Sequence, residues 1–535
     1  MVYRDKSMAR IQKILIVGGG TSGWLSAAYL ARMMGTYRPG GAEITLVEAS
    51  DIGTIGVGEA TIPPIRTIVA ALGIDEATFM QETSATYKLA IKFDNWLKNP
   101  KTDPHSYYHT FGKFSQVGAD LMAAYWVMDR ANTKLNFVDY TMMEGRLCDI
   151  GCGPKRIDDL QFQGPLQYAY HFDAGRLAKL LKKVSAHNGV KHLIGKVKNV
   201  VMAEDGSIAA LETEEHGHLS ADLYLDCTGF SAHLIEKAMK VPFHPYADIL
   251  FCDKAVACQV AYEDPACEIP PYTTSTAQEN GWTWDIPLND RRGIGYVYSS
   301  RHTDKDRAEE VARGYIGETT SEYELVHLDM RVGSRREPWR KNCVAIGLSG
   351  GFVEPLESTG IYLVDIALRW LVDFMPSTES MELGAASFNK MMNACYADVV
   401  DFVKMHYCLS ERTDTEFWID NRRESSLPDS LLDKLESWRC RMPGIYEFTG
   451  IPNVFGLTNY MQVMYGMEFD TDLSGYESRY GHLDAARQQA QQFGAAAMGG
   501  AELLPRHRAL IDQIYSGGFQ IQKSQGRPGM VKRNS

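Results

Sequence analysis

The stretch KILIVGGGTSG, residues 13–23, decides the fold of this chain. Its apolar run ends at Val17 and predicts a buried strand, and residues 24–31 after the glycines carry apolar side chains at helical spacing. A second apolar run, residues 43–47, ends at Glu48. Strand, glycine turn, helix and strand together predict a right-handed βαβ unit of the type that binds dinucleotides.

The glycine turn of this unit has the spacing G-x-G-x-x-G, and each glycine has a physical task. Gly18 permits the tight turn, Gly20 lets the backbone approach a pyrophosphate, and Gly23 lets the helix pack closely on the strand. The helix N-terminus faces the phosphate, and Glu48 accepts hydrogen bonds from the ribose. The predicted dinucleotide-binding residues of the unit are Gly18, Gly20, Thr21, Ser22, Gly23 and Glu48. This unit alone leaves the choice between FAD and NAD(P) open.

The composition is that of a globular protein without a nucleic-acid or membrane partner. The chain has 535 residues, with 55 Lys and Arg against 67 Asp and Glu, and the resulting net charge of −12 works against binding a phosphate backbone. No apolar run approaches the roughly 20 residues that cross a bilayer. The N-terminus lacks a signal-peptide core, so we expect a cytoplasmic protein. The ten cysteines show no zinc spacing, and we expect no metal site.

Four further segments carry a specific resemblance. They are GVGEATIP at 56–63, KLAIKF at 88–93, GWTWDIP at 281–287 and FVEPLESTGIY at 352–362. The W-x-W-x-I-P string within the third is the hallmark of flavin-dependent halogenases of the tryptophan halogenase type. The chain resembles that family from about residue 11 to the 457–466 region.

The resemblance implies the fold class and the cofactor. We expect an α/β protein with an FAD-binding, monooxygenase-like layer of the Rossmann type over residues 8–390, into which substrate-site segments are inserted. A mostly helical region over 391–535 completes the substrate site and ends in a flexible tail. FAD would arrive reduced from a separate NAD(P)H-dependent flavin reductase, and the family also suggests a homodimer.

The chemistry that the resemblance implies is halogenation of an electron-rich aromatic ring. A flavin hydroperoxide oxidises chloride or bromide to hypohalous acid, and a lysine holds the halogenating species as a hydrogen-bonded acid or a haloamine. Lys88 matches that lysine, and Glu357 matches the acid that takes the ring proton. The halide would bind at the backbone N–H groups of Thr359 and Gly360, where a helix is expected to begin.

Local patterns around these residues give two further expectations. The alternation along residues 87–93 predicts one strand with Lys88 and Lys92 on the same face. Ser358 or Thr359 is expected to cap the helix that follows, over residues 361–374.

The resemblance also assigns a flavin loop, two gatekeepers and two aromatic walls. Flavin contacts are expected from Gly58, Glu59, Ala60 and Ile62 of the 56–62 loop, and from Gly347. Trp282 and Trp284 would shield the flavin. His109 and Phe111 form one candidate wall of the substrate slot, and Phe455 forms the other.

One segment departs from the family pattern. The Tyr-Tyr pair and the glutamate that clamp the amino-acid end of tryptophan have no clear match in residues 441–448, RMPGIYEF. Free tryptophan would lose its clamp, so indole, a substituted indole or an indole on a larger molecule is at least as well favoured. Two aromatic walls still suit a flat ring, because stacking needs no polar end.

Two other functions are compatible with the dinucleotide fingerprint. A flavin-dependent aromatic monooxygenase, which hydroxylates its substrate, would keep the glycine turn without using Lys88 with Glu357. A flavin-binding protein without turnover requires only the βαβ unit.

Overall fold

The computed structural model describes residues 10–50, 58–317, 323–375, 380–449 and 454–519. Its first sheet has six strands in the order β10-β2-β1-β14-β23-β22. The first five strands of that order pair in parallel and β22 is antiparallel. Their bounds are Lys191–Ile194 (β10), Glu43–Glu48 (β2), Lys13–Val17 (β1), Leu223–Asp226 (β14), Cys343–Ala345 (β23) and Trp339–Arg340 (β22). Helix α1 (Thr21–Met33) joins β1 to β2, which confirms the predicted βαβ unit.

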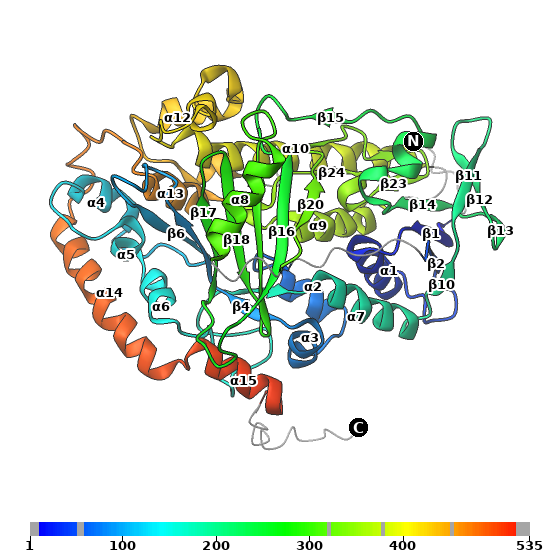
Figure 1. The fold of residues 1–535 in the computed structure, drawn as a ribbon, viewed down its shortest axis with the longest axis horizontal. Helices are drawn as coiled ribbons and strands as arrows, with labels where there is room; N and C mark the ends of the chain where they lie inside the picture. Colours follow the sequence, from blue (N-terminus) through cyan, green and yellow to red (C-terminus); the bar gives the residue numbers. More distant parts are fainter. Residues whose placement is uncertain (1–9, 51–57, 318–322, 376–379, 450–453, 520–535) are drawn as a thin grey trace, which may run out of the picture.

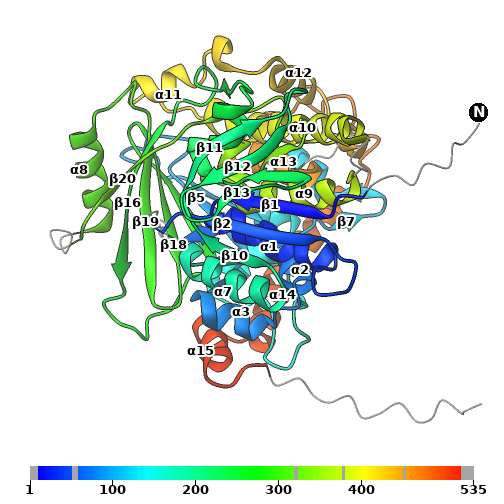
Figure 2. The same ribbon diagram turned by 90° about the vertical axis from the view of Figure 1, so that its right-hand side faces the viewer.

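Both faces of this sheet are covered, as Figure 2 shows. Helix α1 packs against α7 (Ala174–His187) and α9 (Gly360–Asp373) on one face. A three-stranded antiparallel sheet covers the other face. Its strands are β11 (Val197–Met202), β12 (Ile208–Thr213) and β13 (Gly217–Leu219). Leu15 and Tyr224 of the first sheet share a buried apolar cluster with Leu211 of β12. The sheet edge where β1 and β2 end stays available for a ligand.

A second, seven-stranded sheet forms the centre of the molecule (Figure 1). In order its strands are β20 (Val326–Asp329), β16 (Lys254–Ala261), β19 (Arg291–Tyr298), β18 (Gly281–Pro287), β17 (Tyr272–Ala277), β5 (Ala90–Asp94) and β6 (Ser106–Thr110). The W-x-W-x-I-P string therefore makes up all of the largely buried strand β18 except its first residue, Gly281. Helix α8 (Lys305–Ile316) packs on β16 and β19, and α13 (Leu457–Gly466) packs on the edge strand β6.

The single strand expected over residues 87–93 was wrong. Strand β4 (Thr86–Lys88) pairs with β9 (Ala169–Phe172), whereas β5 belongs to the seven-stranded sheet. The chain changes sheets at Leu89, whose N–H donates to the carbonyl of Pro271 at 2.7 Å. Lys88 and Lys92 consequently have different surroundings, since Lys88 is fully buried and the Lys92 side chain is 28% exposed.

Helices dominate the C-terminal region, as expected. They are α10 (Met381–Cys408), α11 (Glu416–Asp420), α12 (Asp429–Trp438), α13, α14 (Leu483–Leu503) and α15 (His507–Gly517). The expected start at residue 391 lies inside α10, and the expected tail from 520 lies outside the described residues. Helix α15 returns to α3 (Glu76–Thr83) of the N-terminal part, and His507 Nε2 accepts the N–H of Tyr87 at 3.1 Å.

None of the described helices is long and apolar enough to cross a membrane. Among the same residues, no group of three or more His, Cys, Asp or Glu side chains is placed to hold a metal ion. The structure describes all ten cysteines, and none of them forms a disulfide.

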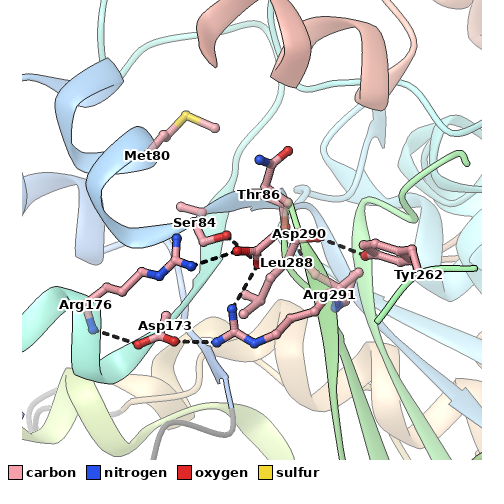
Figure 3. A network of polar contacts seen from close by, with 12 residues as sticks. Met80, Ser84, Thr86, Asp173, Arg176, Tyr262, Leu288, Asp290 and Arg291 are labelled. Carbon is pink, nitrogen blue, oxygen red and sulfur yellow. Dashed lines mark hydrogen bonds and ion pairs between the residues drawn. The ribbon is translucent and has the colours of Figure 1, made fainter. Parts of the chain in front are cut away.

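A polar network holds the β18–β19 turn against the end of α3 and the start of α7 (Figure 3). Arg291 forms an ion pair with Asp173, which also caps α7. Asp290 pairs with Arg176 at 2.8 Å and accepts a hydrogen bond from the Ser84 hydroxyl at 2.7 Å. The turn between two strands of the central sheet is thus fixed to the ends of α3 and α7.

The same turn fixes the strand that carries Lys88. The Thr86 hydroxyl donates to the carbonyl of Pro287, the last residue of β18, at 2.6 Å. Thr86 is two residues before Lys88 in β4, so the network also sets the position of this lysine.

We predict that Asp173→Ala lowers the free energy of unfolding more than the loss of a helix cap alone. Asp173 accepts the Arg176 N–H at 2.7 Å, and losing such a cap costs about 1 kcal/mol. The variant also removes the ion pair of Arg291 with Asp173 in a site that is 12% exposed, leaving Arg291 only its pair with Asp290 at 2.9 Å, and this loss adds about 1 to 3 kcal/mol. Urea denaturation measures both parts together.

Asp304→Ala is the matched control, because Asp304 caps α8 by accepting the Arg307 N–H at 2.8 Å. It should cost only the cap, about 1 kcal/mol. Equal losses in the two variants would show that the Asp173–Arg291 pair does not stabilise the turn.

Candidate functional site

The glycine turn between β1 and α1 is closely packed on one side and open on the other. Gly18 has φ +112°, and a Cβ there would lie 2.3 Å from the carbonyl oxygen of Cys227. A Cβ at Gly23 would lie 1.9 Å from the Gly18 carbonyl oxygen, so helix and turn can meet only without a side chain. A Cβ at Gly20 would meet no atom of the described residues within 4 Å. The open space at Gly20 lies at the N-terminus of α1, where a phosphate is favoured.

Glu48 lies directly against this turn. Its Oε1 is 2.8 Å from His192 Nε2 and 3.3 Å from Lys182 Nζ. Its Oε2 points toward the turn, since a Cβ at Gly19 would lie 1.4 Å from that oxygen. His192 and Lys182 therefore hold one carboxylate oxygen of Glu48 in place, and the other oxygen lies beside the glycine turn, where the phosphate is predicted to bind.

The remaining predicted cofactor contacts gather around α1 and α9. Gly347 has φ +67°, and its backbone approaches Ser22 so closely that a Cβ would lie 2.8 Å from the serine Cβ. The Thr21 hydroxyl is 3.4 Å from the carbonyl of Ala174 at the start of α7. These contacts bring the end of β23 beside the start of α1, although the two are far apart in the sequence.

The described part of the predicted flavin loop runs from the central sheet to α9. Gly58 has φ +88° and faces Ile286 of β18, and Glu59 and Ala60 form the short strand β3, which pairs with β9. Ile62 lines a small cavity together with Tyr362 of α9. Residues 56 and 57 of this loop lie outside the described residues.

Lys88 is buried and points toward the segment that precedes α9. Its Nζ donates to the Ser358 hydroxyl at 2.8 Å and lies 5.6 Å from the ring centroid of Phe111. Burial lowers the pKa of Lys88 to about 7, against an opposing effect of the Glu357 charge. Ser358 has φ +59°, and neither its hydroxyl nor that of Thr359 accepts a hydrogen bond from a backbone N–H of α9, so the expected cap was wrong. The serine hydroxyl contacts Lys88 instead.

Glu357 is 1% exposed and is enclosed by two histidines. Its Oε2 is 2.8 Å from His109 Nδ1, and its Oε1 is 2.6 Å from His406 Nε2. The second contact is within ion-pair distance but is not a hydrogen bond, since neither of its two atoms has a hydrogen-bond partner among the described residues. Burial raises the pKa of Glu357, but the opposite effect of His109 and then His406 is larger in sum, and the pKa is about 2. The side chain is therefore a carboxylate at neutral pH.

Sequence reasoning missed His406 and Asn459, which complete this cluster. His406 is in the middle of α10 and is fully buried. Asn459, on α13, donates from Nδ2 to His109 Nε2 at 2.9 Å. No local pattern marks either residue, because a histidine on the apolar face of a helix and an asparagine near a helix start are ordinary there.

The predicted halide position is at the N-terminus of α9. Thr359 is buried and Gly360 is exposed. Within the described part of the chain, no acceptor for either backbone N–H is found. Two free N–H groups at a helix N-terminus, directly after Glu357 and Ser358, provide a partial positive charge suited to a small anion.

Phe111 and Phe455, from the two expected walls of the substrate slot, both lie near the cluster of Lys88 and Glu357. They contact different residues of it. Phe111 lies beside Lys88. Phe455 is buried and stacks on Phe402, with ring centroids 3.8 Å apart and an interplanar angle of 17°. Phe402 in turn lies 5.6 Å from the ring of His109. Phe402 therefore links Phe455 to the cluster around Glu357, and sequence reasoning missed it.

The two predicted gatekeepers are neighbours in β18. Trp282 and Trp284 are buried, with ring centroids 6.2 Å apart. Neither indole N–H has a hydrogen-bond partner among the residues that the structure describes. An unpartnered buried donor costs about 1 to 3 kcal/mol, so each of these N–H groups lowers the free energy of unfolding.

Known proteins resemble this chain over most of its length. The tryptophan halogenase family matches residues 13–475. Tryptophan 6-halogenase SttH of Streptomyces toxytricini is 37% identical, over 81% of this chain and 84% of its own. Tryptophan 7-halogenase RebH of Lentzea aerocolonigenes is 36% identical over 97% of this chain and 99% of its own. The crystal structure of a tryptophan halogenase from Shewanella frigidimarina has a TM-score of 0.89 and 32% identity, covering 95% of this chain and 98% of the other. With its fold, its βαβ unit and its W-x-W-x-I-P strand all in agreement, the chain belongs to the tryptophan halogenase family of flavin-dependent halogenases.

Proposed function

We propose that this enzyme binds FAD at the glycine turn and a halide at the start of α9, and that Lys88 and Glu357 transfer the halogen to an aromatic ring. The residues present fit the cofactor, because Gly20 opens on free space at a helix N-terminus and Glu48 presents a carboxylate oxygen beside it. When bound in its reduced form, FAD supplies the electrons with which dioxygen oxidises a halide to hypohalous acid. A separate NAD(P)H-dependent flavin reductase supplies the reduced form.

Lys88 is suited to capture the halogen as an uncharged amine. With a pKa of about 7, much of Lys88 carries a lone pair at neutral pH. The amine nitrogen attacks the halogen of hypohalous acid, so an N–X bond forms, the O–X bond breaks and the hydroxide leaves with one amine proton as water. Burial shields the resulting haloamine from bulk water.

Glu357 completes the transfer. The haloamine nitrogen takes up one proton, the aromatic carbon attacks the halogen, a C–X bond forms, and the N–X bond breaks with its electron pair remaining on Lys88 as the free amine. The cationic ring then loses its proton to the Glu357 carboxylate, which releases it, so the proton taken up by the haloamine is returned. The Ser358 hydroxyl holds Lys88 beside this carboxylate. The burial of an amine and a carboxylate in one cluster is the observation that carries the proposal.

An indole ring without an amino-acid end is the substrate class that we propose. Glu447, the one acidic residue of the 441–448 segment, is occupied by Arg441 at 2.8 Å and by the Gly444 N–H at 2.6 Å. The segment therefore has no carboxylate free for an ammonium group. Tyr446 is 87% exposed and Ile445 is 56% exposed, so the same segment presents apolar side chains instead. These features favour indole, a substituted indole or an indole on a larger molecule.

Gly20→Ala tests the cofactor site without disturbing the fold. The backbone at this position, φ −74° and ψ −177°, is open to alanine, so the free energy of unfolding should change by less than about 1 kcal/mol. The new methyl group would occupy the space beside the helix N-terminus, and the dissociation constant for FAD should rise about tenfold or more. Titration of FAD fluorescence measures it.

Gly314→Ala is the control, since Gly314 lies in α8 and a Cβ there also meets no described atom within 4 Å. Its FAD affinity should equal that of the wild type. If Gly20→Ala also binds FAD normally, the pyrophosphate is not at this turn.

Lys88→Ala should abolish ring halogenation, because the amine that carries the halogen is removed. Reduced-flavin oxidation and FAD affinity should stay at wild-type levels, as Lys88 is assigned no cofactor contact. Glu357→Gln should slow ring halogenation by about a hundredfold or more, since the amide cannot take the ring proton. Mass spectrometry of the aromatic product and stopped-flow flavin absorbance measure the two processes separately.

The matched control is Lys92→Ala, which removes a lysine of the same segment that pairs with Asp94 at 3.6 Å. It should halogenate like the wild type. Halogenation retained in Lys88→Ala, or lost equally in Lys92→Ala, would contradict the role of Lys88.

Substrate preference follows from the occupied glutamate. With FAD, a flavin reductase, NADH, oxygen and bromide, mass spectrometry should show brominated indole in clear excess over brominated tryptophan when both are offered at equal concentration. A preference for tryptophan would show that another group binds the amino-acid end. A hydroxylated product in place of a brominated one would show that the enzyme is a monooxygenase and would contradict the proposed halogenation.

A further inference from the structure

The C-terminal helix α15 places a histidine against the strand that carries Lys88. His507 is the first residue of α15 and is fully buried. Its Nε2 accepts the N–H of Tyr87 at 3.1 Å, and its Nδ1 lies 2.9 Å from the carbonyl oxygen of Ile269. Tyr87 directly precedes Lys88 in β4. One imidazole ring from the end of the chain therefore joins the neighbour of Lys88 to the segment that leads into β17.

These two contacts fix the form of the ring. A carbonyl oxygen only accepts, so the hydrogen of His507 is on Nδ1, and Nε2 presents a lone pair to the Tyr87 N–H. A second ring hydrogen, on Nε2, would face another donor. Burial lowers the pKa of His507 to about 4, although its hydrogen bond to Ile269 acts in the opposite direction. The imidazole is therefore uncharged at neutral pH, as both contacts require.

Strand β4 lies at the edge of its own sheet. The order of that sheet is β3-β9-β4, so β9 pairs with only one of the two edges of β4. At the other edge, the N–H of Tyr87 meets His507, and the N–H of Leu89 donates to the carbonyl of Pro271 at 2.7 Å. The backbone is thus held on both sides of Lys88, and on one side a side chain holds it.

The ladder of the central sheet shows where β4 would otherwise continue. Strands β5 and β17 pair in parallel, with Ala90 opposite Tyr272. One residue earlier, the same register places Leu89 opposite Pro271, and these two are hydrogen-bonded. In a regular parallel sheet the chain before Leu89 would pair with the segment before Pro271 in the same way.

The ladder is interrupted at the histidine ring. Its next hydrogen bond would run from the N–H of Tyr87 to the carbonyl of Ile269, which the register places opposite. Both of these groups bond to His507 instead, one to each ring nitrogen. The imidazole is therefore inserted in that hydrogen bond. It keeps the two backbones apart at the point where β4 leaves the central sheet to pair with β9.

We propose that His507 is a positioning residue that acts through Tyr87: its inserted ring diverts β4 from the central sheet and so directs Lys88 toward Ser358. The Lys88 Nζ donates to the Ser358 hydroxyl at 2.8 Å. Direct pairing of Tyr87 with Ile269 would instead draw the backbone of Lys88 into the central sheet. The inference rests on the proposed halogen-transfer role of Lys88, and it makes α15 part of the structure that supports halogen transfer.

Helix α15 has other anchors, so a change of the ring leaves the helix in place. The Tyr515 hydroxyl donates to the carbonyl of Met80 at 2.7 Å. Arg508 donates from Nε to the carbonyl of Cys267 at 2.9 Å. These bonds use side chains of α15 other than His507, which allows the ring to be tested alone.

Two substitutions separate the two bonds of the ring. The amide of asparagine lies near the position of Nδ1, so His507→Asn can still donate to Ile269 but leaves the Tyr87 N–H without an acceptor. The amide of glutamine reaches the position of Nε2, so His507→Gln can still accept that N–H but loses the bond to Ile269. Each variant loses one buried hydrogen bond, so an effect through stability alone would be similar in both. The inference predicts a defect in His507→Asn that His507→Gln largely avoids.

Hydrogen exchange tests the position of the ring without turnover. In the protein without flavin or halide, residue-resolved exchange measured by mass spectrometry should show a protected Tyr87 amide. Exchange at Tyr87 should be about tenfold faster or more in His507→Asn and close to the wild-type rate in His507→Gln. Equal protection of Tyr87 in the wild type and in His507→Asn would overturn the inference.

The yield of ring bromination per reduced flavin tests the consequence for Lys88. In His507→Asn, the brominated indole formed per reduced flavin oxidised should fall about tenfold or more, because a misplacement of about 1 Å suffices for such a loss. Flavin oxidation and FAD affinity should stay at wild-type levels, and a soluble 1,3-diketone should trap the hypobromous acid that Lys88 no longer captures. In His507→Gln the yield should stay within about threefold of the wild type. A loss of flavin oxidation together with bromination would indicate a general structural defect and would overturn the inference.

His302→Asn is the matched control. The His302 side chain is 6% exposed, and its ring nitrogens lie 2.8 Å from the Ser299 hydroxyl and 3.1 Å from Asp420 Oδ2. Its bromination yield and its Tyr87 exchange should be those of the wild type, and equal changes in this variant would overturn the specific role of His507. A wild type that forms no brominated ring, with the predicted difference in Tyr87 exchange present, would refute the proposed function and still support the position of the His507 ring.

Discussion

The site depends on burying an amine and a carboxylate together in a medium that disfavours charge. An uncompensated buried ion costs several kcal/mol, and the chain meets this constraint differently at each group. Burial lowers the pKa of Lys88 to about 7, and its Nζ keeps one hydrogen bond to Ser358. Glu357 keeps its negative charge because His109 donates to one oxygen and His406 faces the other. The amine is therefore much easier to deprotonate than an exposed lysine, while the acid stays ionised.

The fold serves this cluster by bringing four separate segments to one point. Lys88 ends β4, His109 belongs to β6, Glu357 ends a short 3-10 turn before α9, and His406 lies on α10. The change of sheet at Leu89 matters most, because it directs Lys88 toward α9 while the following strand continues in the central sheet. The polar network at the β18–β19 turn fixes β4 from the other side (Figure 3).

Local sequence patterns were sufficient for the dinucleotide unit and insufficient for the catalytic cluster. The apolar run before Gly18 and the glycine spacing predicted β1, α1 and β2, because contacts within a few residues determine them. The importance of Lys88 came only from the resemblance, since alternation alone predicted an ordinary strand lysine. The break after Lys88 depends on hydrogen bonds to residues far along the chain, and the role of His406 depends on the approach of Glu357, so no local pattern contains either.

The central claim, that Lys88 is buried as an uncharged amine, can be measured directly in the free energy of unfolding of the wild type and of Lys88→Met as a function of pH. The pKa of Lys88 is about 7 in the folded state against an ordinary value of 10.5, so the unfolded wild type binds more protons between these values. Wild-type stability should therefore rise with pH relative to Lys88→Met over this window, by up to about 1.4 kcal/mol per pH unit, and the difference should level off below it. Lys92→Met, at a partly exposed position, should not reproduce this trend. Parallel stability curves for the wild type and Lys88→Met would show that Lys88 is an ammonium in the folded protein and would contradict the account.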